Sequence, residues 1–95
     1  MARYVSLLRF TAQGARNLRQ SRARASAFRR AADKAGVKVE AQLWTVGAYD
    51  GIMILNAPNE TKALSVVAKL AAAGNVSTQS MRAFDAKEFA AIVGK

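Results

Sequence analysis

The chain has 95 residues, of which 52% are hydrophobic and 22% charged, a composition typical of a single globular domain and not of a disordered or fibrous protein. It contains no cysteine and no histidine, which excludes disulfides, thiolate metal sites, thiol nucleophiles and a histidine general base. Fifteen Lys and Arg against six Asp and Glu give a net charge of +9. Residues 1–38 hold ten of these cations and one anion, so the excess is local.

The same composition sets expectations for compartment and cofactors. We expect a cytoplasmic protein, because the cysteine framework of small secreted domains is missing and residues 1–10 alternate instead of forming a continuous apolar leader. No stretch is long and apolar enough to span a bilayer. We expect no metal and no cofactor: a haem would have only tyrosine or methionine as an axial ligand, and no Gly-rich phosphate loop follows a strand.

The first third of the chain predicts a strand and a long basic helix. Residues 3–10 alternate with the period of a half-buried strand. Thr11 can cap a helix over about residues 13–35, which is rich in Ala, Arg and Leu and stops at Gly36. Leu18 and Phe28 are expected to anchor its narrow, alanine-rich apolar stripe. The adjoining polar side of this helix forms a cationic arc of Arg16, Arg19, Arg22, Arg29, Arg30 and Lys34.

The middle of the chain predicts a hairpin. Residues 37–46 alternate, with Val37, Val39, Ala41 and Leu43 expected on one face of a second strand. The two glycines and the aspartate of residues 47–51 are typical of a turn. Residues 52–55 are continuously apolar, which predicts a central third strand that is buried on both faces.

The last third predicts a helix, a strand and a short terminal helix. Asn59 is expected to cap the second long helix, which stops at residues 74–75. Residues 76–84 alternate as a fourth strand. Asp85 and Glu88 have the spacing of a capping box, which predicts a further helix after them.

The order of elements is β-α-β-β-α-β plus a terminal helix, which predicts one α+β domain over residues 1–95 with the split β-α-β or ferredoxin-like fold. Two right-handed crossovers put both long helices on one face of a four-stranded antiparallel sheet. Alternation predicts that the other, uncovered face presents residues from the set Tyr4, Ser6, Glu40, Gln42, Trp44, Asn56, Thr78, Ser80 and Arg82, mixed with Leu8 and Ile54. Because a partly apolar open face is typical of an interface, we expect a homodimer.

Residues 47–50, Gly-Ala-Tyr-Asp, followed by residues 52–55 and Ala57-Pro58, resemble the GYD-domain family, which is named for its Gly-x-Tyr-Asp segment. The likeness continues into residues 74–78 and 82–89 and spans almost the whole chain. The resemblance implies a ferredoxin-like fold, paired as a dimeric α+β barrel in which two sheets face each other. It implies no established activity, and the density of arginine on the first helix is heavier than the family would suggest.

Four residues are candidates for a ligand pocket: Trp44, Tyr49, Asp50 and Arg82. Asp50 beside Tyr49 could act as a proton-transfer pair at a pocket mouth, with Trp44 as the apolar wall and Arg82 as an anion clamp. The interpretation we favour is that Asp50 bonds backbone amides of the turn and Tyr49 packs over the hairpin. For Arg82, an ion pair with Glu40 or Asp50 and a ligand contact stay open as equal alternatives. The sequence assigns no catalytic residue.

The sequence therefore predicts a protein that binds a small molecule in a pocket of a dimeric α+β barrel, and whether it is an enzyme stays open. The alternative is non-specific binding of nucleic acid or of an acidic partner through the cationic arc. Residues 52–55 lack the aromatics on which ferredoxin-like RNA binders stack bases, and the arc can also be a solvated helix face. Membrane binding is disfavoured, because the apolar stripe of the first helix is mostly alanine and is needed by the sheet.

Overall fold

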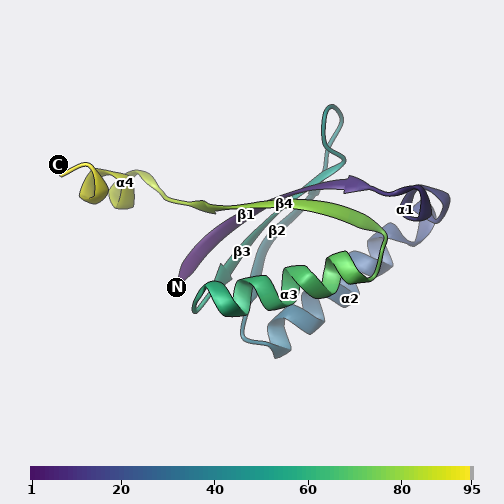
Figure 1. The fold of residues 1–95 in the computed structure, drawn as a ribbon, viewed down its shortest axis with the longest axis horizontal. Coiled ribbons are helices and arrows are strands. Elements are labelled where there is room, and N and C mark those ends of the chain that lie inside the picture. The colour runs from purple at the N-terminus through teal and green to yellow at the C-terminus, as the bar shows by residue number, and fades with distance from the viewer. Residues whose placement is uncertain (95) are drawn as a thin grey trace.

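The computed structural model describes residues 1–94 and shows one four-stranded antiparallel sheet with strand order β2-β3-β1-β4. Its elements are β1 (Ala2–Phe10), α1 (Ala12–Arg16), the 3-10 helix η1 (Leu18–Gln20), α2 (Ser21–Lys34), β2 (Lys38–Trp44), β3 (Gly51–Ala57), α3 (Glu60–Ala72), β4 (Val76–Ala83) and α4 (Ala86–Ile92). Both α2 and α3 cover the same face of the sheet (Figure 1). The predicted α+β fold is confirmed. None of the helices in the described part of the chain has the length and hydropathy needed to cross a membrane.

Side-chain caps begin helices α1, α3 and α4 where the sequence predicts. The Thr11 side chain accepts a hydrogen bond from the backbone N–H of Gly14, and Asn59 caps α3 in the same way. Asp85 and Glu88 form the predicted capping box of α4. Such side-chain acceptors satisfy amides that have no partner within the first turn of a helix.

The predicted continuous helix over residues 13–35 is wrong, because the chain divides there into α1, η1 and α2. Asn17 leaves helical geometry, with φ −114° and ψ 39°, and its carbonyl accepts a 2.8 Å hydrogen bond from Nη1 of Arg24. The break also moves Leu18 off the predicted apolar stripe: its side chain is 53% exposed and anchors nothing. Phe28 does pack against the core, beside the fully buried Ala32.

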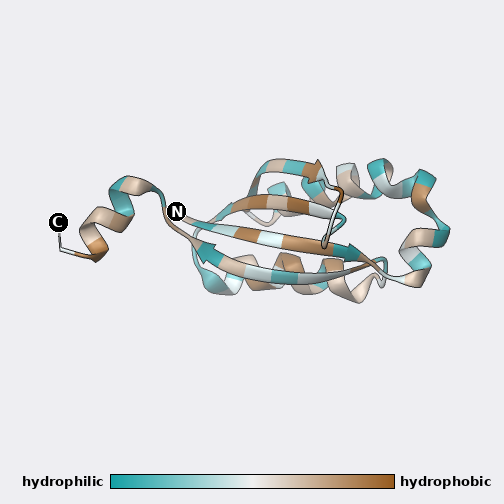
Figure 2. Cartoon of the chain, turned by 90° about the horizontal axis from the view of Figure 1, so that it is seen from above, coloured by the Kyte–Doolittle hydropathy of each residue, from teal (hydrophilic) through white to brown (hydrophobic). Residues whose placement is uncertain are grey.

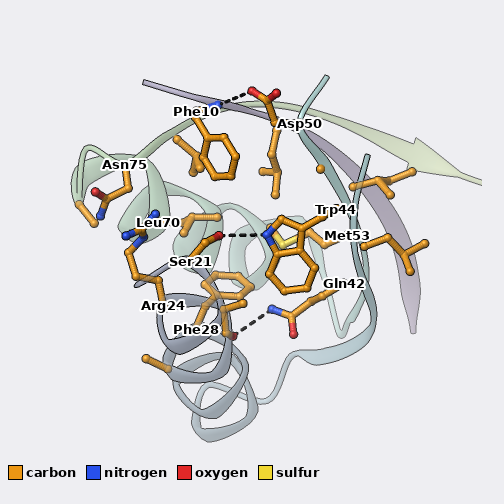
Figure 3. A pocket seen from close by; sticks show the side chains of 18 of the residues that line it. Phe10, Ser21, Arg24, Phe28, Gln42, Trp44, Asp50, Met53, Leu70 and Asn75 are labelled. Atoms are coloured by element: carbon orange, nitrogen blue, oxygen red, sulfur yellow. Dashed lines mark hydrogen bonds between the residues drawn. The ribbon is translucent and has the colours of Figure 1, made fainter. Parts of the chain in front are cut away.

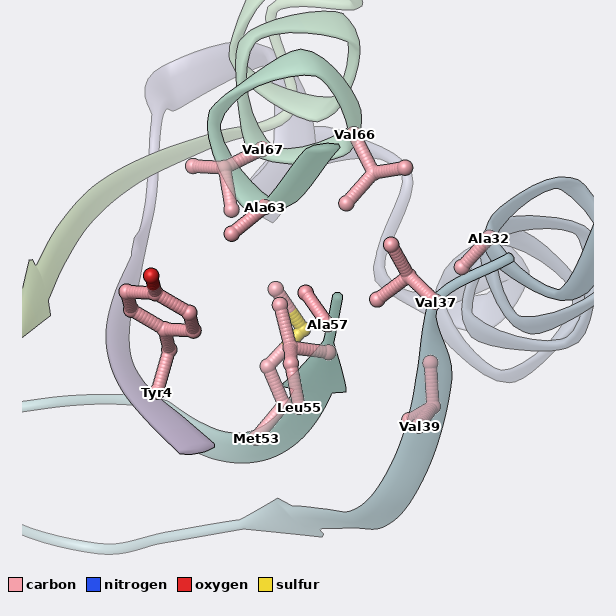
Figure 4. Packing of buried hydrophobic residues seen from close by; sticks show 10 residues of the cluster. All are labelled: Tyr4, Ala32, Val37, Val39, Met53, Leu55, Ala57, Ala63, Val66 and Val67. Atoms are coloured by element: carbon pink, nitrogen blue, oxygen red, sulfur yellow. The ribbon is translucent and has the colours of Figure 1, made fainter. Parts of the chain in front are cut away.

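The core lies between the sheet and the two long helices. Met53, Leu55 and Ala57 point from β3 toward α3, whose Val66 and Val67 meet them (Figure 4). The other members are Tyr4, Ala32, Val37, Val39 and Ala63. Several of these side chains are small, which lets the helices approach the sheet closely. Apolar burial of this kind stabilises a fold by about 25 cal/mol per Å² of apolar surface removed from water.

A β-bulge in β2 changes which of its side chains face the helices. The register with β3 shifts between Val39 and Ala41. Ala41 therefore pairs with Ile54 on the open face, while Gln42 pairs with the buried Met53 and turns toward α2. A bulge of this kind reverses the alternation of every residue after it. The predicted shared face of Val37, Val39, Ala41 and Leu43 is wrong beyond Val39.

The predicted composition of the open face is wrong for most of its members. Tyr4 and Ser6 are buried on the helix-covered side, because strand β1 is apolar on both sides and packing, not alternation, selects the buried one. The same side carries their cross-strand partners Arg82 and Ser80. Gln42, Trp44, Leu8 and Thr78 also lie on the helix-covered side, and only Glu40, Asn56 and Ile54 of the predicted set lie on the open face.

The open face carries a band of aliphatic side chains without the predicted tryptophan. Its apolar members are Val5, Leu7, Ala41, Leu43, Ile52, Ile54 and Met81. Hydrophobic positions along the two central strands, β1 and β3, lie uncovered in the view of Figure 2. Strand β3 alternates buried and half-buried residues, so the prediction that both of its faces are buried is wrong for the single chain.

Helix α4 projects beyond the end of the sheet as an arm (Figure 1). None of its residues is buried, and Phe89, Ile92 and Val93 in and after it are exposed. An ion pair between Nη1 of Arg3 and Oε1 of Glu88, at 3.3 Å, ties the arm to the start of β1. The apolar side of this amphipathic helix therefore has no packing partner within the described part of the chain.

A close contact fastens α1 to the turn between α3 and β4. The Thr11 amide donates to the Asn75 carbonyl at 3.1 Å, and its hydroxyl donates to the Gly74 carbonyl at 2.6 Å. Gly14 lies so near this turn that an added Cβ would stand 2.0 Å from the Asn75 carbonyl oxygen. The position therefore needs glycine for space.

We predict that Gly14→Ala lowers the free energy of unfolding. Forcing an extra methyl into packed structure costs about 1–3 kcal/mol, and here the obstacle is a backbone carbonyl that cannot rotate away. This cost outweighs the ~1 kcal/mol that alanine gains over glycine in helix propensity. Urea denaturation measures the loss, with Ala15→Ser, exposed on the same helix, as the control. Equal stability of Gly14→Ala and the parent chain would contradict the close contact.

Candidate functional site

The candidate site is a cavity of about 440 Å³ between the sheet and the pair α2 and α3 (Figure 3). This volume falls within the roughly 300–1,000 Å³ of small-molecule sites. Its larger apolar walls are Leu8, Phe10, Phe28, Trp44, Met53 and Leu70. Polar side chains border it at a few points only: Ser21, Arg24, Gln42, Asp50, Lys69 and Asn75.

The cavity exists because small side chains face large ones across it. Ala25, Ala27 and Ala31 form much of the wall contributed by α2, beside Phe28, and Gly51 begins β3 on the opposite side. Ser21 at the start of the same helix bonds the Trp44 indole, but these alanine side chains are too short to fill the space. The alanines of α2 thus do not pack closely against the sheet everywhere. They leave an opening next to the part of β2 that follows the bulge.

Trp44 is fixed as a wall by hydrogen bonds that join β2 to α2. Its Nε1 donates to the Ser21 hydroxyl at 3.0 Å, and Nε2 of the nearby Gln42 donates to the Ala25 carbonyl at 3.0 Å. Arg29 in turn donates to Oε1 of Gln42 at 3.2 Å. Trp44 remains 50% exposed, so one part of the indole meets the cavity and another meets solvent. The polar edge of the ring has its partner and the apolar face stays available.

Asp50 fastens the β2–β3 loop to the end of β1. One carboxylate oxygen accepts the Phe10 amide at 2.9 Å, and the Asp50 amide donates to the Leu8 carbonyl at 2.8 Å. Its own carbonyl accepts the Thr45 amide at 2.9 Å. The favoured interpretation is that the Asp50 side chain bonds backbone amides of the turn. The side chain does bond a backbone amide, but this amide belongs to β1 and not to the turn. The same side chain borders the cavity.

Tyr49 lies on the other side of the sheet from the cavity. Its hydroxyl donates to Oε1 of Gln79 at 2.7 Å, and the Arg9 guanidinium stands 4.7 Å from the centre of its ring. Gln79 and Arg9 belong to the open face. Tyr49 and Asp50 thus point to opposite sides, and the structure does not assemble them as a proton-transfer pair.

Arg82 lies at the far end of the sheet and does not line the cavity. Its guanidinium stacks 4.4 Å from the Phe84 ring centre and donates to the backbone carbonyls of Arg3 and Ala83. Neither proposed ion pair forms, since Glu40 is paired with Arg3 at 3.9 Å and Asp50 with backbone. Of the four candidates, the cavity brings together Trp44 and Asp50.

Comparison with known protein families gives one result for this arrangement: a model described as the GYD domain matches residues 4–93. The chain belongs to the GYD-domain family. No curated protein and no solved structure matches it. The matched residues include the cavity walls, the open face and α4 of this GYD domain.

The cationic arc of this GYD domain lies on its exposed helix surface. All six of its side chains are exposed: Arg16, Arg19, Arg22, Arg29, Arg30 and Lys34. Within residues 1–94 both ion pairs involve Arg3, so no carboxylate neutralises the arc. In the same part of the chain no three acidic residues gather as metal ligands would. The arc does not contribute to the cavity.

Arg24, Phe28, Lys69 and Leu70 line the cavity but were not among the predicted pocket residues. They come from two helices that are far apart in the sequence. Phe28 could have been found as a large residue on the alanine-rich stripe, and Arg24 from its place at the border of that stripe. No local signal marks Lys69.

We predict that Asp50→Ala destabilises the GYD domain by about 1–3 kcal/mol, because the Phe10 amide loses its acceptor in a partly buried place. Asp50→Asn keeps an acceptor oxygen and should lose less. The tryptophan emission of each variant during urea denaturation measures the difference. An Asp50→Ala variant as stable as the parent chain would show that the loop needs no such tie.

Proposed function

We propose that this GYD domain binds an apolar small molecule in the cavity between the sheet and helices α2 and α3. The observation that carries the proposal is the composition of the walls: six large apolar side chains surround about 440 Å³, and Trp44 forms one side. An apolar cavity with a few oriented polar groups is the usual form of a small-molecule site.

The polar groups around the cavity support binding more directly than catalysis. Trp44 and Gln42 direct their N–H groups to α2, and Asp50 directs its carboxylate to the Phe10 amide. These bonds fix the walls before a ligand arrives, which lowers the entropic cost of binding. Tyr49, the nearest acid-base partner that the sequence offers Asp50, lies on the other face.

Trp44 is the single tryptophan of the chain, so its emission reports the cavity directly. We predict that the neutral probe N-phenyl-1-naphthylamine binds saturably and changes this emission. Ala25→Phe, which places a ring on the cavity wall, should weaken binding about tenfold or more, a change of only ~1.4 kcal/mol.

The matched control is Ala23→Phe, an exposed position on the same helix that does not line the cavity. This variant should bind the probe as the parent chain does. If both phenylalanine variants bind equally well, the probe occupies some other surface and the proposed site is wrong.

We also propose that two copies pair through their open sheet faces, as in the dimeric α+β barrel that the family resemblance implies. The open face offers an aliphatic band around Leu7, Ile52 and Ile54. Charge supports a second copy as the occupant: the six-residue cationic arc lies on the helix side, whereas on the open face Arg3 pairs with Glu40 and Glu88 and Arg9 stacks on Tyr49, which leaves Lys38 at the edge strand. Two strongly cationic chains can approach each other best through this face.

The arm formed by α4 adds to the same argument. It extends from the end of the edge strand β4, and its Phe89, Ile92 and Val93 are exposed. In a twofold pair each copy presents the same surfaces, so both arms can cover apolar surface of the other copy.

We predict a dimer by sedimentation velocity for the parent chain and a monomer for Ile54→Glu, because a charge in the centre of an apolar interface is buried without a partner. Leu64→Glu is the control, since Leu64 is an exposed aliphatic residue on α3, on the other side of the sheet. This control should remain dimeric. A parent chain that sediments as a monomer at micromolar concentration overturns the pairing.

The alternative function expected from the sequence concerns the cationic arc. None of its six residues lines the cavity, so binding of nucleic acid or of an acidic partner there is independent of the proposed site. That function stays a prediction.

A further inference from the structure

We infer that the ligand of this cavity is an amphipathic anion, with an apolar body between the walls and an anionic oxygen group at the edge formed by Arg24 and Lys69. This inference rests on the proposed binding function and adds the chemical class of the ligand. It is based on the sign of the charged side chains that border the cavity and on whether each of them already has a partner.

Three charged residues line the cavity: Arg24 from α2, Lys69 from α3 and Asp50 from the loop before β3. Asp50 is engaged, since its carboxylate accepts the Phe10 amide. Lys69 makes no ion pair within residues 1–94. The two helices therefore each supply a cation to a site whose one carboxylate already has a hydrogen-bond donor.

Arg24 is half-buried and held in place while keeping donors free. Its Nη1 donates to the Asn17 carbonyl at 2.8 Å and its Nη2 approaches the Gly14 carbonyl at 3.5 Å. A guanidinium has five N–H donors, so these bonds position the group without exhausting it. In Figure 3, Arg24 lies on the side of the cavity away from Trp44. An anionic group there would leave the apolar body of the ligand facing the indole.

The surrounding charge favours the same sign of ligand. The helix that carries Arg24 also carries Arg22, Arg29 and Arg30, and Asp33 is the only anion within residues 1–38. Apolar walls of low dielectric constant strengthen the field of nearby cations. A cationic ligand would be repelled, and a neutral acceptor would gain less than an anionic oxygen from the donors at this edge.

Two fluorescent probes with the same aromatic body test the inference: neutral N-phenyl-1-naphthylamine and its sulfonate, 8-anilinonaphthalene-1-sulfonate. The parent chain should bind the sulfonate more tightly than the neutral probe. Arg24→Gln should reduce that preference about tenfold, as expected for a charge-assisted hydrogen bond in a partly buried place. Lys69→Gln should reduce it about two- to fivefold, because Lys69 is exposed.

Each variant has a matched control on its own helix. Arg22→Gln and Lys62→Gln remove exposed cations that do not line the cavity, so they act only through the screened general field and should lower the sulfonate preference by less than about twofold. The affinity for the neutral probe shows in every case that the variant still folds and keeps its cavity. Added salt should weaken the sulfonate preference and leave the neutral probe unaffected.

The outcomes separate this inference from the proposed function. If the neutral probe binds in an Ala25→Phe-sensitive way but the sulfonate shows no preference, the anionic ligand class is wrong and the cavity stands. If all four charge variants reduce the preference equally, the effect is one of net charge, and the assignment to Arg24 and Lys69 is overturned. If neither probe binds, both proposals fall.

Discussion

The β-bulge in β2 is the constraint on which the site depends. With unbroken alternation after Val39, Leu43 would continue the helix-facing row and Trp44 would stand on the open face. The register shift reverses this and turns the indole and the Gln42 amide toward the helix side, where the partly buried Gln42 N–H groups need an acceptor. Helix α2 supplies acceptors for both side chains through Ser21 and a backbone carbonyl. Trp44 then faces the alanine-rich side of α2 across a cavity that Phe10, Phe28 and Leu70 also line.

The same shift shapes the other face of the sheet. It sends Leu43 to join the aliphatic residues of β1 and β3, and it removes Trp44 from that surface. Most of the cationic charge lies on the other side: the cationic arc belongs to the helices, whereas at the open face Arg3 is balanced by two glutamates and Arg9 stacks on Tyr49. The two faces therefore have different chemistry, one suited to an anion beside an apolar cavity and the other to burial against apolar surface.

Much of the fold could be predicted because its signals are local. A threonine, an asparagine and an Asp-Glu pair begin helices by accepting amides within one turn, and the order of elements then leaves few topologies. The break at Asn17 has no local mark; it lies beside the contact of Gly14 with Asn75, about sixty positions away, and the Arg24 guanidinium bonds the Asn17 carbonyl. The bulge has no local mark either, and β1 is apolar on both sides, so packing against the helices decides that Tyr4 is buried.

The Gly-Ala-Tyr-Asp segment shows why half of the site could be predicted and half could not. The sequence singles out its last two residues as neighbours, but in the loop before β3 their side chains point to opposite sides of the sheet. Asp50 accordingly ties the loop to β1 at the cavity, and Tyr49 covers Arg9 and Gln79 on the open face. The segment therefore makes contacts on both faces of the sheet. Tyr49 and Asp50 therefore cannot exchange a proton as a pair. The segment instead shapes both surfaces, because each of these side chains bonds residues on a different face of the sheet.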